Sequence, residues 1–176
     1  ADVNISDHVG LTPLHITALE DMDKLVPVLL DQGAKLEAKD NYGYTPLHLA
    51  TDQGNFKVGQ ALVIRGANVN NRADWDTTPL QSSITQGNTK LVKLLFKNGA
   101  DITAKDRLGR SALHWAAEKG HLSTTKFLIR NGASIHHKDN EGHTPLHDAA
   151  KWDQQKISKL LIFHGASVNA KGVDGR

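Results

Sequence analysis

The sequence predicts an all-α solenoid made of paired short helices that stack along the chain. Two observations in its 176 residues carry this prediction. A four-residue motif, Thr-Pro-Leu-His in its commonest form, recurs every 33 residues, and a Gly-Ala pair recurs in the same register. The motif begins at Thr12, Thr45, Thr78, Ser111 and Thr144, and the pair begins at Gly33, Gly66, Gly99, Gly132 and Gly165. A fixed period of this length, free of insertions and deletions, is typical of a repeat array.

The first helix of each unit is predicted to begin at the recurring motif. In the second copy, the Thr45 hydroxyl can cap a helix, and Pro46 suits the first helical position, where its missing N–H costs nothing. Leu47 and Ala50 then give a small apolar face. Gly54 can adopt the left-handed conformation that ends the helix.

A second helix is predicted from apolar residues at i, i+3 and i+4 spacing. In the third copy these are Leu91, Leu94 and Leu95, and the Gly-Ala pair at 99–100 ends the helix. Turn-forming residues over 101–109 lead into the next copy. Two such short helices cannot bury their apolar faces alone, so neighbouring units must stack into one continuous core.

A 33-residue period with this motif, a glycine in mid-unit and a closing Gly-Ala pair resembles the ankyrin repeat. The resemblance covers nearly the whole chain and implies antiparallel helix pairs joined by β-turn or hairpin loops. It divides the chain into five repeats over residues 7–39, 40–72, 73–105, 106–138 and 139–171. Residues 1–6 then match the tail of a preceding repeat, and residues 172–176 match the start of a sixth. We therefore expect a segment of a longer array or of a multidomain protein.

The composition excludes several classes of protein. The chain has no cysteine, which rules out disulfides, thiolate metal sites and a cysteine nucleophile. The same absence favours an intracellular compartment, the cytoplasm or the nucleus. The longest apolar stretches, 28–30 and 160–163, are far shorter than the about 20 residues that cross a bilayer, so no transmembrane segment is expected.

The net charge of +2 is unevenly distributed along the chain. Residues 1–88 contain six basic and eleven acidic residues, whereas residues 89–176 contain fifteen basic and eight acidic residues. Cations also recur on the predicted second helices of the last three repeats, at Lys93, Lys97, Lys126, Arg130 and Lys159. One interpretation is a solvated surface. The other is an electrostatic docking site for nucleic acid or anionic lipid.

Positions that differ between repeats are free to carry function. The resemblance implies that the turn tips and the ends of the first helices line a concave groove that holds a partner protein. Both tyrosines and two of the three tryptophans fall at these positions, and Tyr, Trp and Arg are the residues that most often anchor interfaces. The candidate partner-binding residues are Tyr42, Tyr44, Trp75, Arg107, Leu108, Arg110, His143 and Trp152. The alternative is that these side chains only cover neighbouring loops.

No catalytic, cofactor or metal site is predicted. Four of the ten histidines belong to the repeated motif, and the resemblance implies a structural hydrogen-bonding role for them: His15, His48, His114 and His147. One cluster has ligand-like residue types, at His136, His137, Asp139 and His143. Its adjacent histidines tend to point apart on a turn, which argues against a metal ion. Nucleotide-binding, zinc-protease and serine-hydrolase motifs are absent, so we expect a non-catalytic protein–protein interaction scaffold without a cofactor.

Asn70 and Asn169 are candidate modification sites. Each follows a valine and lies eight residues after a leucine, and both resemble the turn asparagines that an asparaginyl hydroxylase modifies in ankyrin repeats. The alternative is that asparagine serves the geometry of the turn.

The third repeat departs most from the pattern. Ala73 replaces the leading Asp, Asp76 replaces the turn glycine, and Gln81 replaces the motif histidine. This repeat is therefore either weak or has a turn that is reshaped around Trp75.

Three more residues are informative by their position in the repeat. Asp21 and Asp153 stand where a glycine ends the first helix in other copies, although Asp accepts the left-handed conformation less readily. Trp115 lies inside the first helix of the fourth repeat, and we expect it in the core.

Overall fold

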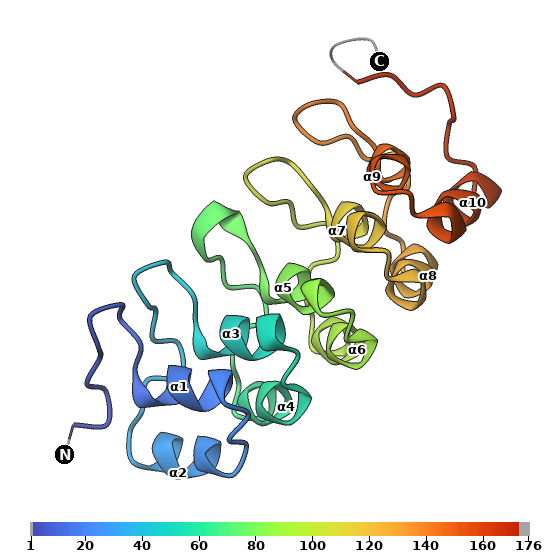
Figure 1. Cartoon of the computed structure of the whole chain (residues 1–176). Coiled ribbons are helices and arrows are strands. Elements are labelled where there is room, and N and C mark those ends of the chain that lie inside the picture. The colour runs from blue at the N-terminus through green and yellow to red at the C-terminus, as the bar shows by residue number, and fades with distance from the viewer. Residues whose placement is uncertain (1, 173–176) are drawn as a thin grey trace. The chain divides into compact units, whose positions relative to one another are not determined.

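The computed structural model describes residues 2–172, and this part of the chain is built from α-helices (Figure 1). An antiparallel bridge joins Lys105 and Ser111, and no longer strand occurs among the described residues. The predicted all-α repeat fold is therefore confirmed. The chain forms two compact units, the first ending at Ala100 and the second beginning at Asp101.

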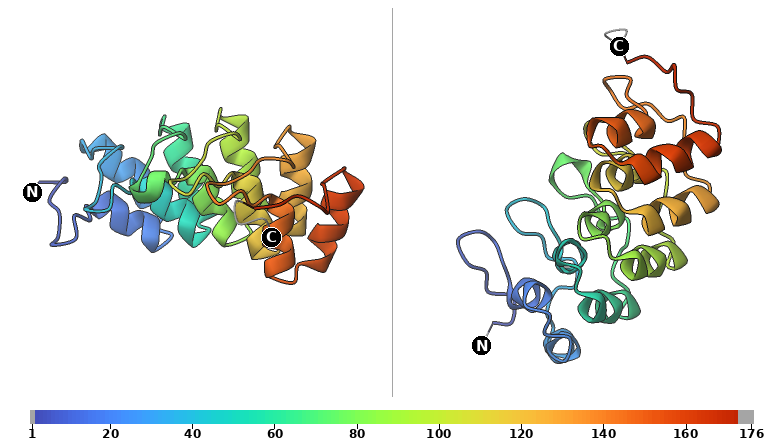
Figure 2. Two further views of the ribbon diagram at one scale, coloured as in Figure 1. Left: turned by 90° about the horizontal axis from the view of Figure 1, so that it is seen from above. Right: turned by 45° about the vertical axis from the view of Figure 1, so that its right-hand side comes forward.

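The first unit contains three helix pairs and one short 3₁₀ turn. The helices are α1 (Pro13–Leu19), α2 (Leu25–Asp31), α3 (Pro46–Gln53), α4 (Phe56–Ile64), α5 (Pro79–Thr85) and α6 (Thr89–Lys97), and the turn is η1 (Asp74–Asp76). Helices α1, α3 and α5 pack side by side in one row, and α2, α4 and α6 form a second row against it. Figure 2 shows both rows from two further directions.

The second unit repeats this arrangement with two helix pairs. The helices are α7 (Ala112–Lys119), α8 (Leu122–Arg130), α9 (Pro145–Lys151) and α10 (Gln155–Phe163). Helix α7 packs on α9, α8 packs on α10, and each first helix contacts its own second helix. No helix of residues 2–172 combines the length and the apolarity that crossing a membrane requires.

The helix boundaries follow the local chemistry that the sequence predicts. Thr45 is the N-cap of α3, its hydroxyl accepts a hydrogen bond from the His48 N–H, and Pro46 is the first helical residue. Gly54 ends α3 in the left-handed conformation, with φ of 77°. Asp153, in the corresponding place after α9, also adopts this conformation, with φ of 52°. The chain therefore accepts the strain of a left-handed aspartate to keep the turn between the two helices.

The core is a continuous apolar layer between the two rows of helices in each unit. Leu47 and Leu80 contribute to it from the first row, and Leu62, Leu91 and Leu95 contribute from the second. All five are essentially inaccessible to solvent. Burial of one such side chain stabilises the folded state by about 1.5–3 kcal/mol.

The motif histidines connect each repeat to the next one within a unit. The Thr45 N–H donates to His48 Nδ1 at 3.2 Å, and His48 Nε2 lies 3.1 Å from the carbonyl oxygen of Thr77. An amide N–H only donates and a carbonyl only accepts. The His48 ring must therefore be neutral, with its proton on Nε2.

The same pair of hydrogen bonds recurs at His15 and His114, whose Nδ1 atoms accept the N–H groups of Thr12 and Ser111. His15 Nε2 lies 3.0 Å from the Tyr44 carbonyl oxygen, and His114 Nε2 lies 3.0 Å from the His143 carbonyl oxygen in the second unit. Burial lowers the pKa of His48 and of His114 to about 4, and it also lowers the pKa of His15. The structural role that the resemblance implied for these residues is thus visible in their contacts.

We expect the free energy of unfolding to fall as the pH is lowered from about 6.5 to about 4. Imidazole in the unfolded chain binds a proton below pH 6.5, whereas folded His48 stays neutral down to about 4, so acid favours the unfolded state. His48→Gln removes this titration, since Gln81 holds the same place in the third repeat and accepts the Thr78 N–H. In urea unfolding at about pH 7 and pH 4.5, the wild type should lose about 2 kcal/mol more than the variant. Equal losses would contradict the neutral tautomer.

The turn of the third repeat is reshaped, as one of the two sequence hypotheses held. In the other copies an aspartate at the base of the loop accepts two backbone N–H groups, as Asp40 Oδ1 does from Tyr42 and Tyr44 at 2.9 and 2.8 Å. Ala73 has no such oxygen. The loop instead forms η1, with Trp75 and Asp76 both left-handed at φ of 61° and 56°.

Replacement of Asp76 by glycine should stabilise the first unit by about 0.5–1 kcal/mol, because glycine carries no steric penalty at positive φ. The matched control is Asp74→Gly in the same turn. Asp74 is not left-handed, so glycine there relieves no strain and only raises the entropy of the unfolded chain, which lowers stability. Denaturant midpoints of the two variants test this. A control variant as stable as Asp76→Gly would show that the left-handed backbone is not the source of the effect.

Candidate protein-binding surface

The loops that precede the first helices are joined tip to tip within each unit. In the first unit, the Asn41 N–H donates to the Val9 carbonyl at 3.1 Å, and the Asp74 N–H donates to the Tyr42 carbonyl at 2.9 Å. In the second unit, Asn140 N–H donates to the Leu108 carbonyl at 2.9 Å. We call the surface formed by these loops and by the last turns of the first helices the loop face of each unit.

The loop face of the first unit carries three of the candidate residues. The side chains of Tyr42 and Trp75 lie on adjacent loops and are 57% and 58% exposed. Tyr44 is half-buried, and its ring packs edge-on against His48 with centroids 5.6 Å apart. Burial, with the nearby carboxylates of Asp52, Asp40 and Asp74, raises the Tyr44 pKa. Tyr42 and Trp75 are thus exposed at the surface, whereas Tyr44 supports the loop.

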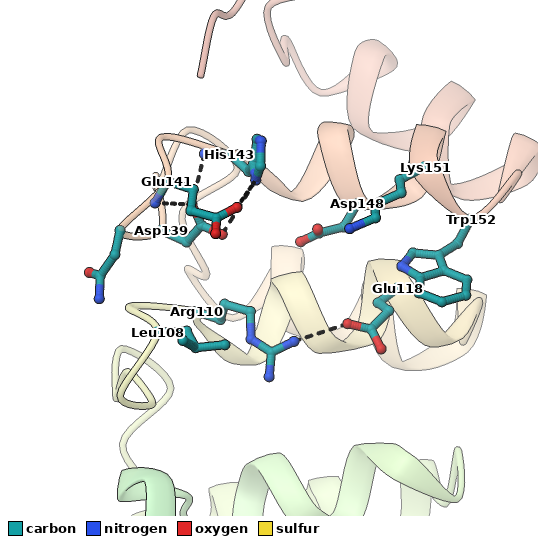
Figure 3. A pocket seen from close by; sticks show the side chains of 10 residues that line it. Leu108, Arg110, Glu118, Asp139, Glu141, His143, Asp148, Lys151 and Trp152 are labelled. Atoms are coloured by element: carbon teal, nitrogen blue, oxygen red, sulfur yellow. Dashed lines mark hydrogen bonds and ion pairs between the residues drawn. The ribbon is translucent and has the colours of Figure 1, made fainter. Parts of the chain in front are cut away.

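The loop face of the second unit contains a pocket of about 420 Å³ (Figure 3). Four candidate residues line it, namely Leu108, Arg110, His143 and Trp152. Arg107 is exposed on the same loop but is not part of the lining. The structure therefore brings together four of the five candidates that lie in this unit.

Arg110 is held in place by two carboxylates and one aromatic ring. Its Nε donates to Asp106 Oδ2 at 2.9 Å, and its Nη1 donates to Glu118 Oε2 at 3.0 Å. Its guanidinium carbon lies 4.6 Å from the centroid of the Trp115 ring. The Trp115 Nε1–H also donates to Asp106 Oδ2, at 3.1 Å. The expectation that Trp115 lies in the core was wrong: the ring is only partly buried, because it supports Arg110 at the surface.

Asp148 is the unusual group of this pocket. Its Oδ2 is shielded from solvent and has no hydrogen-bond partner among the described residues. Figure 3 shows its carboxyl group pointing into the space between His143 and the Arg110–Glu118 pair. Burial raises the pKa of Asp148 to about 7, and the carboxylates of Asp139 and Glu118 act in the same direction. The Asp148 carboxyl is thus ready to change its charge near neutral pH.

The histidines near this pocket take part in hydrogen bonds and ring contacts. His143 Nδ1 lies 3.4 Å from Glu141 Oε2 and 3.8 Å from Asp139 Oδ2. His137 Nε2 lies 2.9 Å from the Gly109 carbonyl oxygen, while its neighbour His136 is exposed. Within residues 2–172, no three His, Asp or Glu side chains are grouped so that they could hold a metal ion.

A family model for ankyrin repeats, described as three copies, matches residues 1–73 and 80–172. The chain belongs to the ankyrin-repeat family. The unmatched segment, 74–79, contains the turn that is reshaped at Trp75. Ankyrin repeats are generally protein–protein interaction modules, and proteins of this family are typically non-enzymatic scaffolds. No curated protein sequence matches this chain.

The five basic candidate residues on the second helices of the last three ankyrin repeats are all exposed. Lys93 and Lys97 lie on α6 of the first unit. Lys126 and Arg130 lie on α8, and Lys159 lies on α10, which packs against α8 in the second unit. These side chains are accessible to solvent and to an anionic partner.

The two candidate asparagines are both exposed. The Asn70 side-chain amide donates to the Gly99 carbonyl at 2.9 Å, and Asn4, at the corresponding place two repeats earlier, donates to the Gly33 carbonyl at 3.1 Å. Asparagine at this position therefore connects successive repeats. Hydroxylation of Asn70 or Asn169 stays a prediction, which the intact mass after incubation with such an enzyme would test.

Sequence reasoning did not single out Asp148 or Glu118 as functional residues. The signal for Asp148 is its place in the repeat, because apolar, aromatic or small residues hold the corresponding position in the other copies: Ile16, Leu49, Ser82 and Trp115. Aligning the repeats therefore shows that Asp148 departs from the pattern at this position. That the Asp148 carboxyl is partly buried is seen only in the folded structure.

Asp148→Asn should stabilise the chain at about pH 8 by about 1–2 kcal/mol, a value reduced by solvent screening of this partly buried group. The folded-state pKa of Asp148 is raised to about 7, so folded Asp148 keeps its proton where the unfolded carboxyl has lost it, and its contribution to stability is lost as the pH rises from about 4 to 7. The gain should therefore grow between pH 5 and pH 8 in urea unfolding. Glu20→Gln, an exposed carboxyl-to-amide change at a residue with ordinary backbone angles, is the control, and an equal gain there would contradict the assignment.

Proposed function

We propose that the chain is a non-catalytic scaffold that holds a partner polypeptide on its loop faces. The observation that carries this proposal is the placement of the exposed aromatic residues. Of the five Tyr and Trp residues, those more than half exposed are Tyr42, Trp75 and Trp152, and all three belong to the loop faces. Such side chains bury a large area when a partner binds and still satisfy a polar tip.

The backbone beneath these side chains supports the proposal. The loop tips are hydrogen-bonded to one another, and the carboxylates of Asp40, Asp106 and Asp139 each accept two N–H groups of their own loop. A surface fixed in this way loses little conformational entropy on binding.

The second candidate function is electrostatic docking of nucleic acid or anionic lipid on the second helices. The exposure of Lys93, Lys97, Lys126, Arg130 and Lys159 favours it. Binding of this kind weakens steeply as salt rises, because it depends on the release of counterions. Capture through Tyr42 and Trp75 depends mainly on buried apolar area and should tolerate salt.

Replacement of Tyr42 and Trp75 by alanine should weaken partner binding at least tenfold, since truncation of an aromatic anchor costs about 2 kcal/mol or more. Tyr44 is kept, because its half-buried ring packs against His48. The partner is captured from the source cells, identified by mass spectrometry, and its affinity for wild type and variant is measured at low and high salt. Phe163→Ala is the control, since Phe163 is 83% exposed but lies at the end of α10.

An unchanged affinity in the double variant, with native helicity and melting temperature, would reject the proposal. Binding that survives in the double variant but is lost in high salt would support the electrostatic alternative.

A further inference from the structure

We propose that the pocket of the second unit binds a cationic side chain, lysine or arginine, of the partner polypeptide, and that the carboxyl group of Asp148 pairs with it. This inference rests on the proposed scaffold function and names what one part of the loop face recognises. Asp148, Leu108 and Trp152 are among the residues that line this pocket.

The first argument is that the Asp148 carboxyl has no partner. Its Oδ2 is shielded from solvent without a hydrogen bond, and it forms no ion pair with any described residue. Buried carboxyl oxygens are nearly always satisfied in native structures, because an unmade hydrogen bond there is costly. Asp148 also lines the open pocket, so its carboxyl group is one that a ligand's N–H donor would satisfy.

The second argument is the charge of the surroundings. Arg110 is already paired with Asp106 and Glu118, and the His143 Nδ1 atom lies 3.4 Å from Glu141 Oε2. Lys151 also lines the pocket, with its side chain exposed to solvent. The Glu118 Oε1 atom accepts Lys119 Nζ at 3.0 Å. Around the pocket, the acidic groups are Glu118, Asp139, Glu141 and Asp148, and the basic or titratable groups are Arg110, Lys151 and His143. Acidic groups outnumber the two permanent cations, so a positive ligand is favoured and an acidic one is repelled.

The third argument is the shape of the walls. Trp152 is 53% exposed and Leu108 is 47% exposed, and both line the pocket. Lysine and arginine bury an apolar stem along such surfaces and keep a charged head for a carboxylate or an aromatic face. Arg110 already shows this arrangement inside the protein, with its guanidinium over Trp115 and its N–H groups on carboxylates.

The test is a titration of the full chain with blocked pentapeptides that differ only in their central residue, which is Lys, Arg, Gln or Glu. Amide and Trp152 indole resonances are followed by NMR at about pH 8, where the Asp148 carboxyl is ionised. The Lys or the Arg peptide should shift Trp152 and residues around Asp148, and the stronger of the two identifies the preferred cation. The Gln and Glu peptides should not.

Asp148→Asn should weaken binding of the cationic peptide at least fivefold, while the control variant Glu20→Gln, which changes an exposed carboxyl of the first unit, should bind as the wild type does. Wild-type affinity should also fall at about pH 5.5, where Asp148 is protonated, because a neutral carboxyl no longer attracts the cation. Lys151→Gln should leave binding unchanged or strengthen it, since Lys151 is exposed and competes for the same carboxyl.

Equal binding of the Lys and Gln peptides, shifts that map outside the pocket, or an unaffected Asp148→Asn variant would each overturn the inference. The proposed scaffold function fails by a separate result, because it depends on Tyr42 and Trp75 of the first unit. If the double variant loses partner binding but the pocket does not respond to the cationic peptides, the scaffold proposal is supported and only the cation site is rejected.

Discussion

The repeats of each unit depend on the hydrogen bond that a buried motif histidine donates to the carbonyl group of the next loop. His48 can make this bond to Thr77 only as the neutral tautomer, because the Thr45 N–H occupies its other ring nitrogen. The ring therefore fixes two things at once: the start of its own helix and the distance to the following repeat. Apolar side chains such as Leu47 and Leu80 give most of the stabilisation, but they specify register less strictly than a directional bond.

The same bond sets the position of the functional side chains. His114 donates a hydrogen bond to the His143 carbonyl, and the His143 N–H donates to Asp139. These bonds fix the loop that carries His143 and Asp139, both of which line the pocket together with Arg110. The positions of the side chains on the loop face therefore depend on the hydrogen bonds between repeats. The third repeat keeps the helix pair yet lacks the loop aspartate, and there the backbone takes two left-handed residues. Trp75 is nevertheless as exposed as Tyr42, which holds the same place in the second repeat. The reshaped turn thus still presents a large aromatic side chain at this place.

The sequence predicts a feature of the fold correctly where that feature depends on neighbouring residues or on the repeat period. Thr45, Pro46 and Gly54 each act within one turn of helix, so their pattern predicts the helix ends that the structure has. The role of Trp115 was mistaken, because its helical position suggests the core while its indole actually supports Arg110 and Asp106. The electrostatics of Asp148 could not be read at all. They arise from groups 5 to 38 residues away in sequence, and only packing brings those groups together.

Arg110 explains why the pocket keeps an unpaired acid. It lies close enough to lower the pKa of Asp148, yet its N–H groups are committed to Asp106, which shapes its loop, and to Glu118. If Arg110 turned to Asp148, the loop aspartate would lose its charge partner and Trp115 would lose its cation. In the folded chain Arg110 therefore stabilises the loop, and the Asp148 carboxyl is left unsatisfied in the pocket. A cation of a bound partner can pair with Asp148 while the contacts of Arg110 stay intact. The arrangement that stabilises the loop is thus also the one that leaves a carboxyl available for binding.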